Sequence, residues 1–368
     1  MENYIWHHQK PARNQRNDAS KLNERTDADP IVTMLRELMQ NLVDAEKVSE
    51  DHLVEIKLFS DTRSNHHMET ILGDVRNRSY ISSKNADGTV KVNSTMVVHE
   101  RGYAGLTGPL TQIRPFNDAQ PNDHFHNFFF VQSKRTKVVG SGGGKGIGKI
   151  TYFLASEARS VFVAANRHGE KEQFGLFGMS EHEQVYEFEE TDWDFLSYWS
   201  HGEAGDSGDY SGACTKQDID IFLDPFGISR SSSYGNSWII PGVDEEKFSE
   251  HTIIRTIIEQ YYTVILNDEL RVKVGEIEIK QGNLDALVSE YVPELEEELN
   301  FIQETMTASN LDYFSVDLTA FPIPNLHKTI KENLGEEASE KISEAYDCLL
   351  YTSPSPRDAH ESRMPSSA

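Results

Sequence analysis

The sequence predicts an α/β protein, because helical patterns of apolar residues alternate with short strand-like segments. Two stretches, residues 30–49 and 249–266, repeat apolar residues three and four positions apart, which is the spacing of a helix with one buried face. Short apolar or alternating runs, typical of strands, occur at 54–60, 94–100, 161–166, 174–179, 185–190, 219–224 and 237–242. A chain that alternates these two kinds of segment is expected to pack helices against a sheet.

Capping and turn residues indicate where several elements begin. Asp29 followed by Pro30 fits an N-cap and a first-turn proline, so the first helix is expected to begin there. Ser249 is a similar N-cap for the helix at 249–266. The remaining expected elements are a helix at 149–160, a hairpin at 271–280 and acidic helices at 292–306 and 330–346. Residues 1–28 are expected to form an irregular polar arm.

Composition and charge exclude several classes of partner. The formal net charge is -25 and the pI is about 4.9, so the chain repels polyanions, and neither a nucleic-acid-binding nor an anionic-membrane surface is expected. No stretch approaches the roughly 18 apolar residues of a membrane span, and the first residues have no apolar signal region. Two cysteines, Cys214 and Cys348, are too few for a disulfide framework. We therefore expect a soluble protein of the reducing cytoplasm.

The last residues, 348–368, differ in composition from the chain before them. The acidic helical pattern ends at Cys348, where the stretch CLLYTSPSPRDAHESRMPSSA begins, rich in serine, proline and arginine. This stretch resembles translated sequencing-adapter read-through, which implies a non-native tail and a natural protein that continues beyond residue 347. A disordered serine- and proline-rich tail is the alternative. Under both interpretations residues 348–368 are not expected to belong to the fold.

A glycine-rich segment, VVGSGGGKGIGKIT at 138–151, has the features of a phosphate-binding loop. Backbone N–H groups of such loops bind phosphate oxygens, and the following helix presents its positive N-terminus to the same anion. Gly143, Gly148 and Lys149 match the P-loop pattern, but Ile150 stands where a P-loop has the serine or threonine that binds magnesium. A P-loop, another kind of phosphate-binding loop and a glycine linker are the alternatives, and the two lysines make the linker the weakest.

The first helix carries a second candidate site. Glu37 and Asn41 are four residues apart, so their side chains share one helix face. An asparagine offers Mg²⁺ an uncharged oxygen, and a glutamate can hold a water molecule and accept its proton. For these two residues alone, a solvated polar face is the alternative.

The string around this pair, LRELMQNLVDA, resembles the N-box of the GHKL ATPases. This is the superfamily of gyrase-type topoisomerases, MutL mismatch-repair proteins, ninety-kilodalton heat-shock chaperones and histidine kinases. Glu37, Asn41, Asp44 and Ala45 have the spacing of that box. The resemblance implies that Glu37 orients and deprotonates the attacking water, that Asn41 holds magnesium and that Asp44 supports the site.

Two further segments resemble the glycine boxes of the same family, in the same order. In HERGYAGLTG (99–108), Glu100 stands where the family has an aspartate that receives the adenine amino group, and Gly102 and Gly105 let backbone approach the nucleotide. The segment at 138–151 then resembles the lid that wraps the β- and γ-phosphates. Its implied phosphate contacts are Gly142, Gly143, Gly144, Lys145, Gly146, Gly148 and Lys149.

A fourth segment, YGNSWII at 234–240, resembles the Gly-Thr box of the family. Asn236 replaces the threonine and keeps its hydrogen-bonding capacity with a different shape. With this segment the resemblance covers roughly residues 29–245. It implies a two-layer sandwich of a mixed β-sheet with helices on one face, the Bergerat-type ATP-binding fold. Residues 246–347 are then expected to be part of a downstream segment, similar to the continuation of some large bacterial GHKL-type ATPases.

The resemblance also implies the ligands and the mode of action. ATP and Mg²⁺ are the expected ligands, slow hydrolysis drives closure of the lid, and closure creates a nucleotide-dependent homodimer surface that serves an unidentified protein partner or effector domain. Two alternatives stay open. Glu100 and Asn236 depart from the family pattern and motivate a nucleotide-gated interaction module without turnover. The glycine segment by itself motivates a P-loop NTPase.

Overall fold

The computed structural model describes residues 3–8, 30–73, 90–111, 123–130, 148–181, 186–188, 191–193, 196–202, 211–230 and 232–307. By its internal contacts the chain divides into two compact units, residues 1–291 and 292–368. Among the helices of the described residues, none combines the length and the apolar character that crossing a bilayer requires.

The first unit is built on a mixed sheet, to which nine strands of the described residues belong. They are β1 (Tyr4–His8), β2 (Leu53–Phe59), β3 (Thr95–Arg101), β4 (Ser160–Asn166), β5 (Phe174–Glu181), β8 (Leu196–His201), β9 (Gly235–Pro241), β10 (Val272–Val274) and β11 (Ile277–Ile279). Their order across the sheet is β1-β8-β5-β4-β9-β3-β2-β10-β11. The pair β2–β10 is parallel and the other neighbours are antiparallel. A separate hairpin joins β6 (Tyr186–Phe188) and β7 (Thr191–Trp193).

One face of the sheet is covered by α2 (Pro30–Asp44), α4 (His124–Phe129), α5 (Gly148–Ala155) and α7 (Glu250–Leu266). The helix α2 packs against both α5 and α7. Aromatic residues of α4 pack on β5, where the rings of Phe129 and Phe177 have centroids 4.7 Å apart. The predicted mixed sheet and the α/β class are thereby confirmed.

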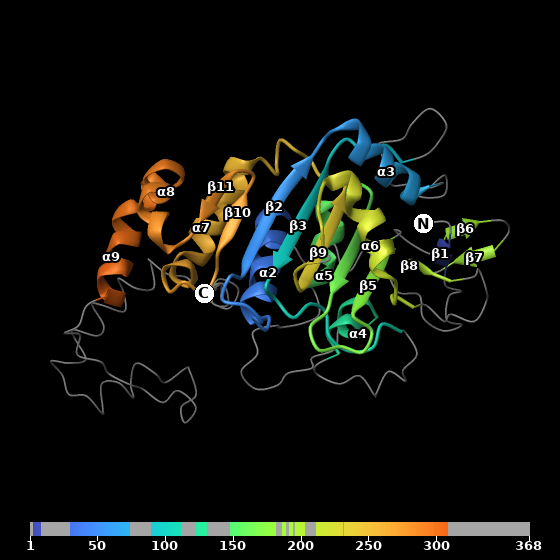
Figure 1. The fold of residues 1–368 in the computed structure, drawn as a ribbon. Coiled ribbons are helices and arrows are strands. Elements are labelled where there is room, and N and C mark those ends of the chain that lie inside the picture. Colours follow the sequence, from blue (N-terminus) through green and yellow to red (C-terminus); the bar gives the residue numbers. More distant parts are fainter. Residues whose placement is uncertain are drawn as a thin grey trace, which may run out of the picture. The chain divides into compact units, whose positions relative to one another are not determined.

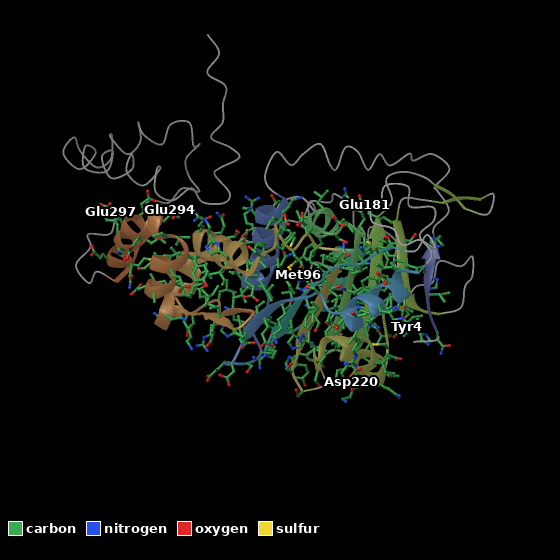
Figure 2. The ribbon with its side chains drawn as sticks, turned by 90° about the horizontal axis from the view of Figure 1, so that it is seen from above. Tyr4, Met96, Glu181, Asp220, Glu294 and Glu297 are labelled. Atoms are coloured by element: carbon green, nitrogen blue, oxygen red, sulfur yellow. The ribbon has the colours of Figure 1, made fainter. Side chains whose placement is uncertain are left out.

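The second face of the sheet also carries helices, which the sequence did not lead us to expect. These are α3 (Thr62–Leu72) and α6 (Lys216–Leu223), followed by the 3₁₀ turn η1 (Asp224–Phe226). Met68 and Phe222 from these helices enter one apolar cluster with Phe162 and Ile239 of the sheet. Figure 1 shows α6 on the side of the sheet opposite to α2 and α5. In Figure 2, Asp220 marks the outer side of α6, Met96 lies within the sheet and Tyr4 marks its β1 edge.

Burial on both faces explains why the central strands read as continuous apolar runs. Every residue of β4 and of β9 is buried, because each strand has helices on either side. Four strands, β1, β8, β10 and β11, lie toward the two edges of the sheet. β1 pairs with β8, and so part of the segment predicted as an irregular arm is a strand of the sheet.

The segment 219–224 was predicted as a strand and is instead part of the helix α6. Thr215 caps this helix with a capping box to Asp218, and Lys216 forms an ion pair with Asp220 one turn later at 2.8 Å. Ile219, Phe222 and Leu223 are buried at helical spacing. The prediction was wrong because it considered only the apolar run and not the helix N-cap Thr215 that precedes it. The predicted helix at 149–160 ends earlier, at Ala155, and Ser160 already begins β4.

The chain beyond the predicted boundary at residue 245 continues the first unit. β10 pairs with β2, and the helix α8 (Leu284–Tyr291) packs against α7. A short 3₁₀ turn, η2 (Gln281–Asn283), joins the hairpin to α8. In the second unit, η3 (Pro293–Leu295) and α9 (Glu296–Thr307) correspond to the acidic helix predicted at 292–306. The helix predicted at 330–346 and the tail 348–368 lie outside the described residues.

Candidate functional site

The polar face of α2 presents the polar residues of the string LRELMQNLVDA (35–45). Glu37, Asn41 and Asp44 follow one another at four- and three-residue spacing, so they share a face of the helix. Glu37 is half-buried, whereas Asn41 and Asp44 are exposed. Burial raises the pKa of the Glu37 carboxyl, and the charge of neighbouring Arg36 opposes the rise. The other face of α2 holds the helix in place through the buried side chains Met34, Leu35, Leu38, Met39 and Leu42.

The chain that leaves α2 is hydrogen-bonded directly to the segment HERGYAGLTG (99–108). The N–H of Val48 donates to the carbonyl of Gly102 at 2.8 Å, and the N–H of Ala104 donates to the carbonyl of Glu46 at 2.9 Å. Lys47 and Tyr103 form an isolated antiparallel bridge between these two segments. Motifs that lie about sixty residues apart in the sequence are therefore held side by side.

Glycines shape the turn that follows β3. Gly102, Gly105 and Gly108 all have positive φ, at 79°, 81° and 89°. At Gly108 a Cβ would lie 2.8 Å from the Cα of Asp123, so both the backbone angle and the space require glycine there. The three-residue repeat of glycine seen in the sequence thus corresponds to a repeated backbone conformation.

Glu100 and Asn236 meet at the beginning of this turn, on the face of the sheet that α2 and α5 cover. Glu100 Oε2 accepts hydrogen bonds from the Asn236 N–H at 3.0 Å and from Asn236 Nδ2 at 2.8 Å, and Oε1 accepts from Trp238 Nε1 at 2.7 Å. Asn236 Oδ1 in turn accepts from the Leu106 N–H at 3.0 Å. Asn236 therefore links the acidic residue to the glycine turn.

This carboxylate is deeply buried and held by neutral donors. Glu100 is 4% exposed. Burial raises the pKa of the Glu100 carboxyl, while the Trp238 N–H, the charge of Arg230 and the Asn236 donors oppose the rise. The Glu100 side chain thus reaches donors on β9. Its predicted contact with adenine stays a prediction.

A buried arginine, Arg230, supports Glu100 from the opposite face of the sheet. Its guanidinium is fully buried and donates to the main-chain carbonyls of Glu100 and Asn236. It also donates to His99 Nδ1 at 2.7 Å and to Ser237 Oγ at 2.8 Å. Burial and the charge of Arg230 lower the pKa of His99 to about 2, so the imidazole is neutral and accepts this bond.

A second buried arginine, Arg167, holds the far end of the glycine turn. Its Nε donates to the carbonyl of Leu106 at 2.5 Å, and its Nη2 donates to the carbonyl of Gly108. Glu170 pairs with Arg167 at 3.3 Å and accepts from the Gly108 N–H at 2.9 Å. Sequence reasoning missed both arginines, since each follows or precedes an apparently polar loop and no local pattern distinguishes it from a surface residue.

Three aromatic residues from α4, α5 and β9 pack against one another. The Trp238 ring lies against Phe128 of α4 and Tyr152 of α5, with centroids 4.8 Å and 5.6 Å away. Burial raises the pKa of the Tyr152 phenol; a hydrogen bond with the Asn41 side chain opposes the rise, and the charges of Glu100 and Glu37 add to it. Sequence reasoning assigned Tyr152 and Trp238 no role. Trp238 lies within the segment 234–240 and Tyr152 directly follows the segment 138–151, and these positions were the only signal available.

The predicted lid is only partly within the described residues. Gly142, Gly143, Gly144, Lys145 and Gly146 lie outside them, whereas Gly148 and Lys149 begin α5. Thr151, the first hydroxyl residue after Lys149, is 2% exposed inside this helix. A P-loop has its magnesium-binding hydroxyl directly after the lysine, and here Ile150 stands at that position.

The donors around Asn41 suit magnesium better than a metal that needs several protein ligands. Within the described residues, no group of three or more histidine, cysteine, aspartate and glutamate residues could hold a metal ion. Mg²⁺ keeps several waters and commonly takes one or two protein oxygens together with phosphate oxygens. An exposed asparagine beside a half-buried glutamate fits that requirement.

Comparison with known proteins yields one kind of match. No family model and no curated protein matches the chain. Among solved structures, the ATPase region of Saccharomyces cerevisiae topoisomerase II bound to ICRF-187 (dexrazoxane) is similar, with a TM-score of 0.35 and 10% sequence identity. The match covers 73% of this chain and 53% of that one, so the chain spans about half the length of that structure. Similarity at this level says nothing about ligand or activity, which depend on the contacts within this chain.

Proposed function

We propose that this protein is a GHKL-type ATPase that binds ATP with Mg²⁺ and hydrolyses it slowly. One observation carries the proposal: motif segments far apart in the sequence converge on one place. Residues 46–48 bond to 102–104, Leu106 bonds to Asn236, and Asn236 bonds to Glu100. The helix α5, which follows the glycine-rich segment and carries Tyr152, packs against α2, which carries Glu37 and Asn41.

The residues divide the chemistry between them. Asn41 would hold Mg²⁺, which neutralises phosphate charge when bound, and Asp44 would support this end of the site. Glu37 would orient a water molecule and accept its proton. Its raised pKa suits a general base, because a base works best when its pKa approaches the ambient pH.

The nucleotide base and the phosphates would be bound at opposite ends of this site. Glu100 and Asn236 would face the base, and the backbone at Gly102 and Gly105 would approach the nucleotide. The segment from Gly142 to Lys149 would close over the phosphates, with the N-terminus of α5 directed at their charge. Closure would exclude water and create a surface for a second copy or for another protein partner, in the cytoplasm where ATP is available.

A nucleotide-gated module without turnover is the second candidate, and the state of Glu100 favours it. Three N–H groups of the protein already donate to the oxygens of Glu100. This carboxylate therefore has less remaining capacity to accept a hydrogen bond from a nucleotide base than an aspartate with one such donor. A P-loop NTPase has less support. Such proteins place the loop between a strand and a helix of a parallel sheet, whereas the described sheet is antiparallel apart from β2–β10.

The three candidates separate in one set of assays. ATP affinity and turnover are measured for the wild type and for Glu37→Ala, Asn41→Ala and Lys149→Ala, with Glu276→Ala on the exposed β10–β11 turn as the control. Loss of a general base should lower turnover by about 100-fold or more. The ATPase proposal therefore expects Glu37→Ala to bind ATP with nearly normal affinity and to lose turnover.

Other outcomes point elsewhere. Unchanged turnover in Glu37→Ala rejects the ATPase proposal. Tight binding by the wild type without measurable turnover supports the module, and sedimentation with and without nucleotide then tests whether closure makes a dimer. A loss confined to Lys149→Ala, with Glu37→Ala and Asn41→Ala indifferent, supports the P-loop alternative.

A further inference from the structure

The helix α7 is kinked at one residue, Tyr261. The φ and ψ of this residue are -130° and 18°, outside the helical range, and the helix continues on both sides of it. The segment EHTIIRTIIEQYYTVIL contains neither proline nor glycine, which are the usual local causes of a kink. The kink therefore points to a contact with another element. The helix packs against α2, which carries Glu37 and Asn41.

The hydroxyl of Tyr261 bonds to the backbone of α2. It donates to the main-chain carbonyl of Arg36, with the two oxygens 2.5 Å apart, and the tyrosine is 5% exposed. The direction of this bond is fixed, because a carbonyl oxygen only accepts. In a helix the same carbonyl also accepts from the N–H four residues later, that of Gln40, and its second lone pair serves the tyrosine. The bond thus holds the turn 36–40, which contains Glu37.

The charges around this hydroxyl agree with its place beside Glu37. Burial raises the pKa of the Tyr261 phenol, the charge of Glu37 adds to the rise, and the charge of Arg36 opposes it. A phenol with a raised pKa stays protonated at neutral pH. Tyr261 therefore keeps the proton that it donates to the carbonyl of α2.

A second bond joins the segments that follow the two helices. Lys47 Nζ donates to the main-chain carbonyl of Glu269 at 2.6 Å. Residues 36–47 are thus bonded to residues 261–269 at both ends. The proposed general base, Glu37, directly follows the first of these contact points.

We propose that Tyr261 is a positioning residue that holds the turn of α2 with Glu37 where its carboxylate meets the attacking water. The inference rests on the proposed function, because Glu37 is the general base of that function. It adds a role for α7, which lies beyond all four motif segments and completes the hydrolytic end of the site. A backbone contact suits this task, since it fixes the point from which the glutamate extends and leaves the carboxylate itself unoccupied.

Small displacements of a general base affect turnover strongly. A base must come within about 2.6–3.2 Å of the group whose proton it accepts, and a displacement of about 1 Å can lower a rate about 100-fold. Loss of a single hydrogen bond loosens the turn without unfolding it, so a partial effect of about 3- to 10-fold is expected. The affinity for ATP depends on other residues and should not change.

The test removes only the hydroxyl. Tyr261→Phe keeps the ring, and Tyr262→Phe is the matched control, because it removes a hydroxyl from the next residue of α7, which is also buried. Turnover is measured by phosphate release at saturating ATP and Mg²⁺, and ATP affinity and the number of active sites with a competing fluorescent nucleotide. We expect Tyr261→Phe to lower turnover per active site about 3- to 10-fold with unchanged ATP affinity. Tyr262→Phe should leave both values near those of the wild type.

Amide hydrogen exchange without nucleotide gives a readout that does not depend on activity. A locally loosened turn exchanges faster only at its own amides, whereas a general loss of stability speeds exchange throughout the protein. We expect exchange at residues 37–41 to be about 3- to 10-fold faster in Tyr261→Phe than in the wild type. Exchange at 161–166, in the buried strand β4, should stay the same.

The outcomes separate this inference from the proposed function. If the wild type has no turnover, or if Glu37→Ala keeps it, the proposed function is rejected and the inference falls with it. If the wild type hydrolyses ATP through Glu37 and Tyr261→Phe keeps full turnover, the inference alone is overturned. The same holds if ATP affinity falls together with turnover, or if exchange at 37–41 rises no more than at 161–166.

Discussion

Replacing Glu100 by glutamine tests whether the buried carboxylate organises the site. In the wild type its two oxygens accept three N–H donors, at 2.7, 2.8 and 3.0 Å. Glutamine has the same shape but one oxygen and one NH₂ group. In the better of its two orientations the oxygen serves both donors of Asn236, and the NH₂ group faces the Trp238 N–H. The Trp238 N–H and the glutamine NH₂ group are both donors, so each is then without an acceptor.

The magnitude follows from that count. A buried donor without an acceptor costs about 1–3 kcal/mol. Relief of the desolvated charge, which is what raises the pKa of Glu100, offsets part of this cost. We therefore expect Glu100→Gln to lower the free energy of unfolding by about 1–2 kcal/mol and to weaken ATP binding, because the Asn236–Leu106 link to the glycine turn loosens.

Urea unfolding monitored by far-UV circular dichroism measures the first effect, and the same titration followed by fluorescence reports on the four tryptophans, Trp238 among them. Glu276→Gln is the control, since this glutamate is exposed. The free energy of unfolding of this variant should stay within about 0.5 kcal/mol of that of the wild type. A Glu100→Gln protein that is as stable as the wild type and binds ATP equally well would refute the reasoning about this network.

Two further predictions concern the glycine turn and a buried acid away from the site. Gly108→Ala should lower the free energy of unfolding by about 2 kcal/mol or more, because alanine disfavours the positive φ and its Cβ would clash with the Asp123 backbone. Gly282→Ala is the control, because a Cβ there meets open space. Equal stability of the two variants in urea would contradict this prediction. Burial raises the pKa of Glu181 from 4.5 to about 7 against the opposing charge of Arg159. A raised carboxyl pKa contributes stability below 4.5 that is lost as the pH rises through about 7, so Glu181→Gln should flatten the pH dependence of unfolding in that range. Parallel curves for wild type and variant would show that Glu181 is not the group involved.

Much of the fold could be predicted because its elements carry local signals. The helix from Pro30 has its proline, its apolar face and its predicted start, and the strands at 54–60, 161–166 and 174–179 have the composition of buried β-structure. The helix α6 shows the limit of this approach. Its apolar run is too short to distinguish a helix from a strand, and the capping box at Thr215 decides the matter.

The site could be predicted in part, for a similar reason. The glycines at 102, 105 and 108 indicate a turn with positive φ, and the helical spacing of Glu37 and Asn41 places these two side chains on one face of α2. Arg230 and Tyr152 could not be found in this way. A buried arginine and a surface arginine look alike in a sequence, and the partners of Arg230 come from two strands that are distant along the chain.

By itself, therefore, the sequence determined where polar and glycine-rich motifs stand and which faces of the helices are apolar, since both depend on neighbours within a few residues. The tertiary structure alone decided that β1 and β10 join the sheet, that α3 and α6 cover its second face, and that Glu100 binds Asn236 and Trp238. Each of these is a contact between segments far apart in the chain. Such contacts depend on the register of strands and on the packing of whole layers, which no local pattern of residues specifies.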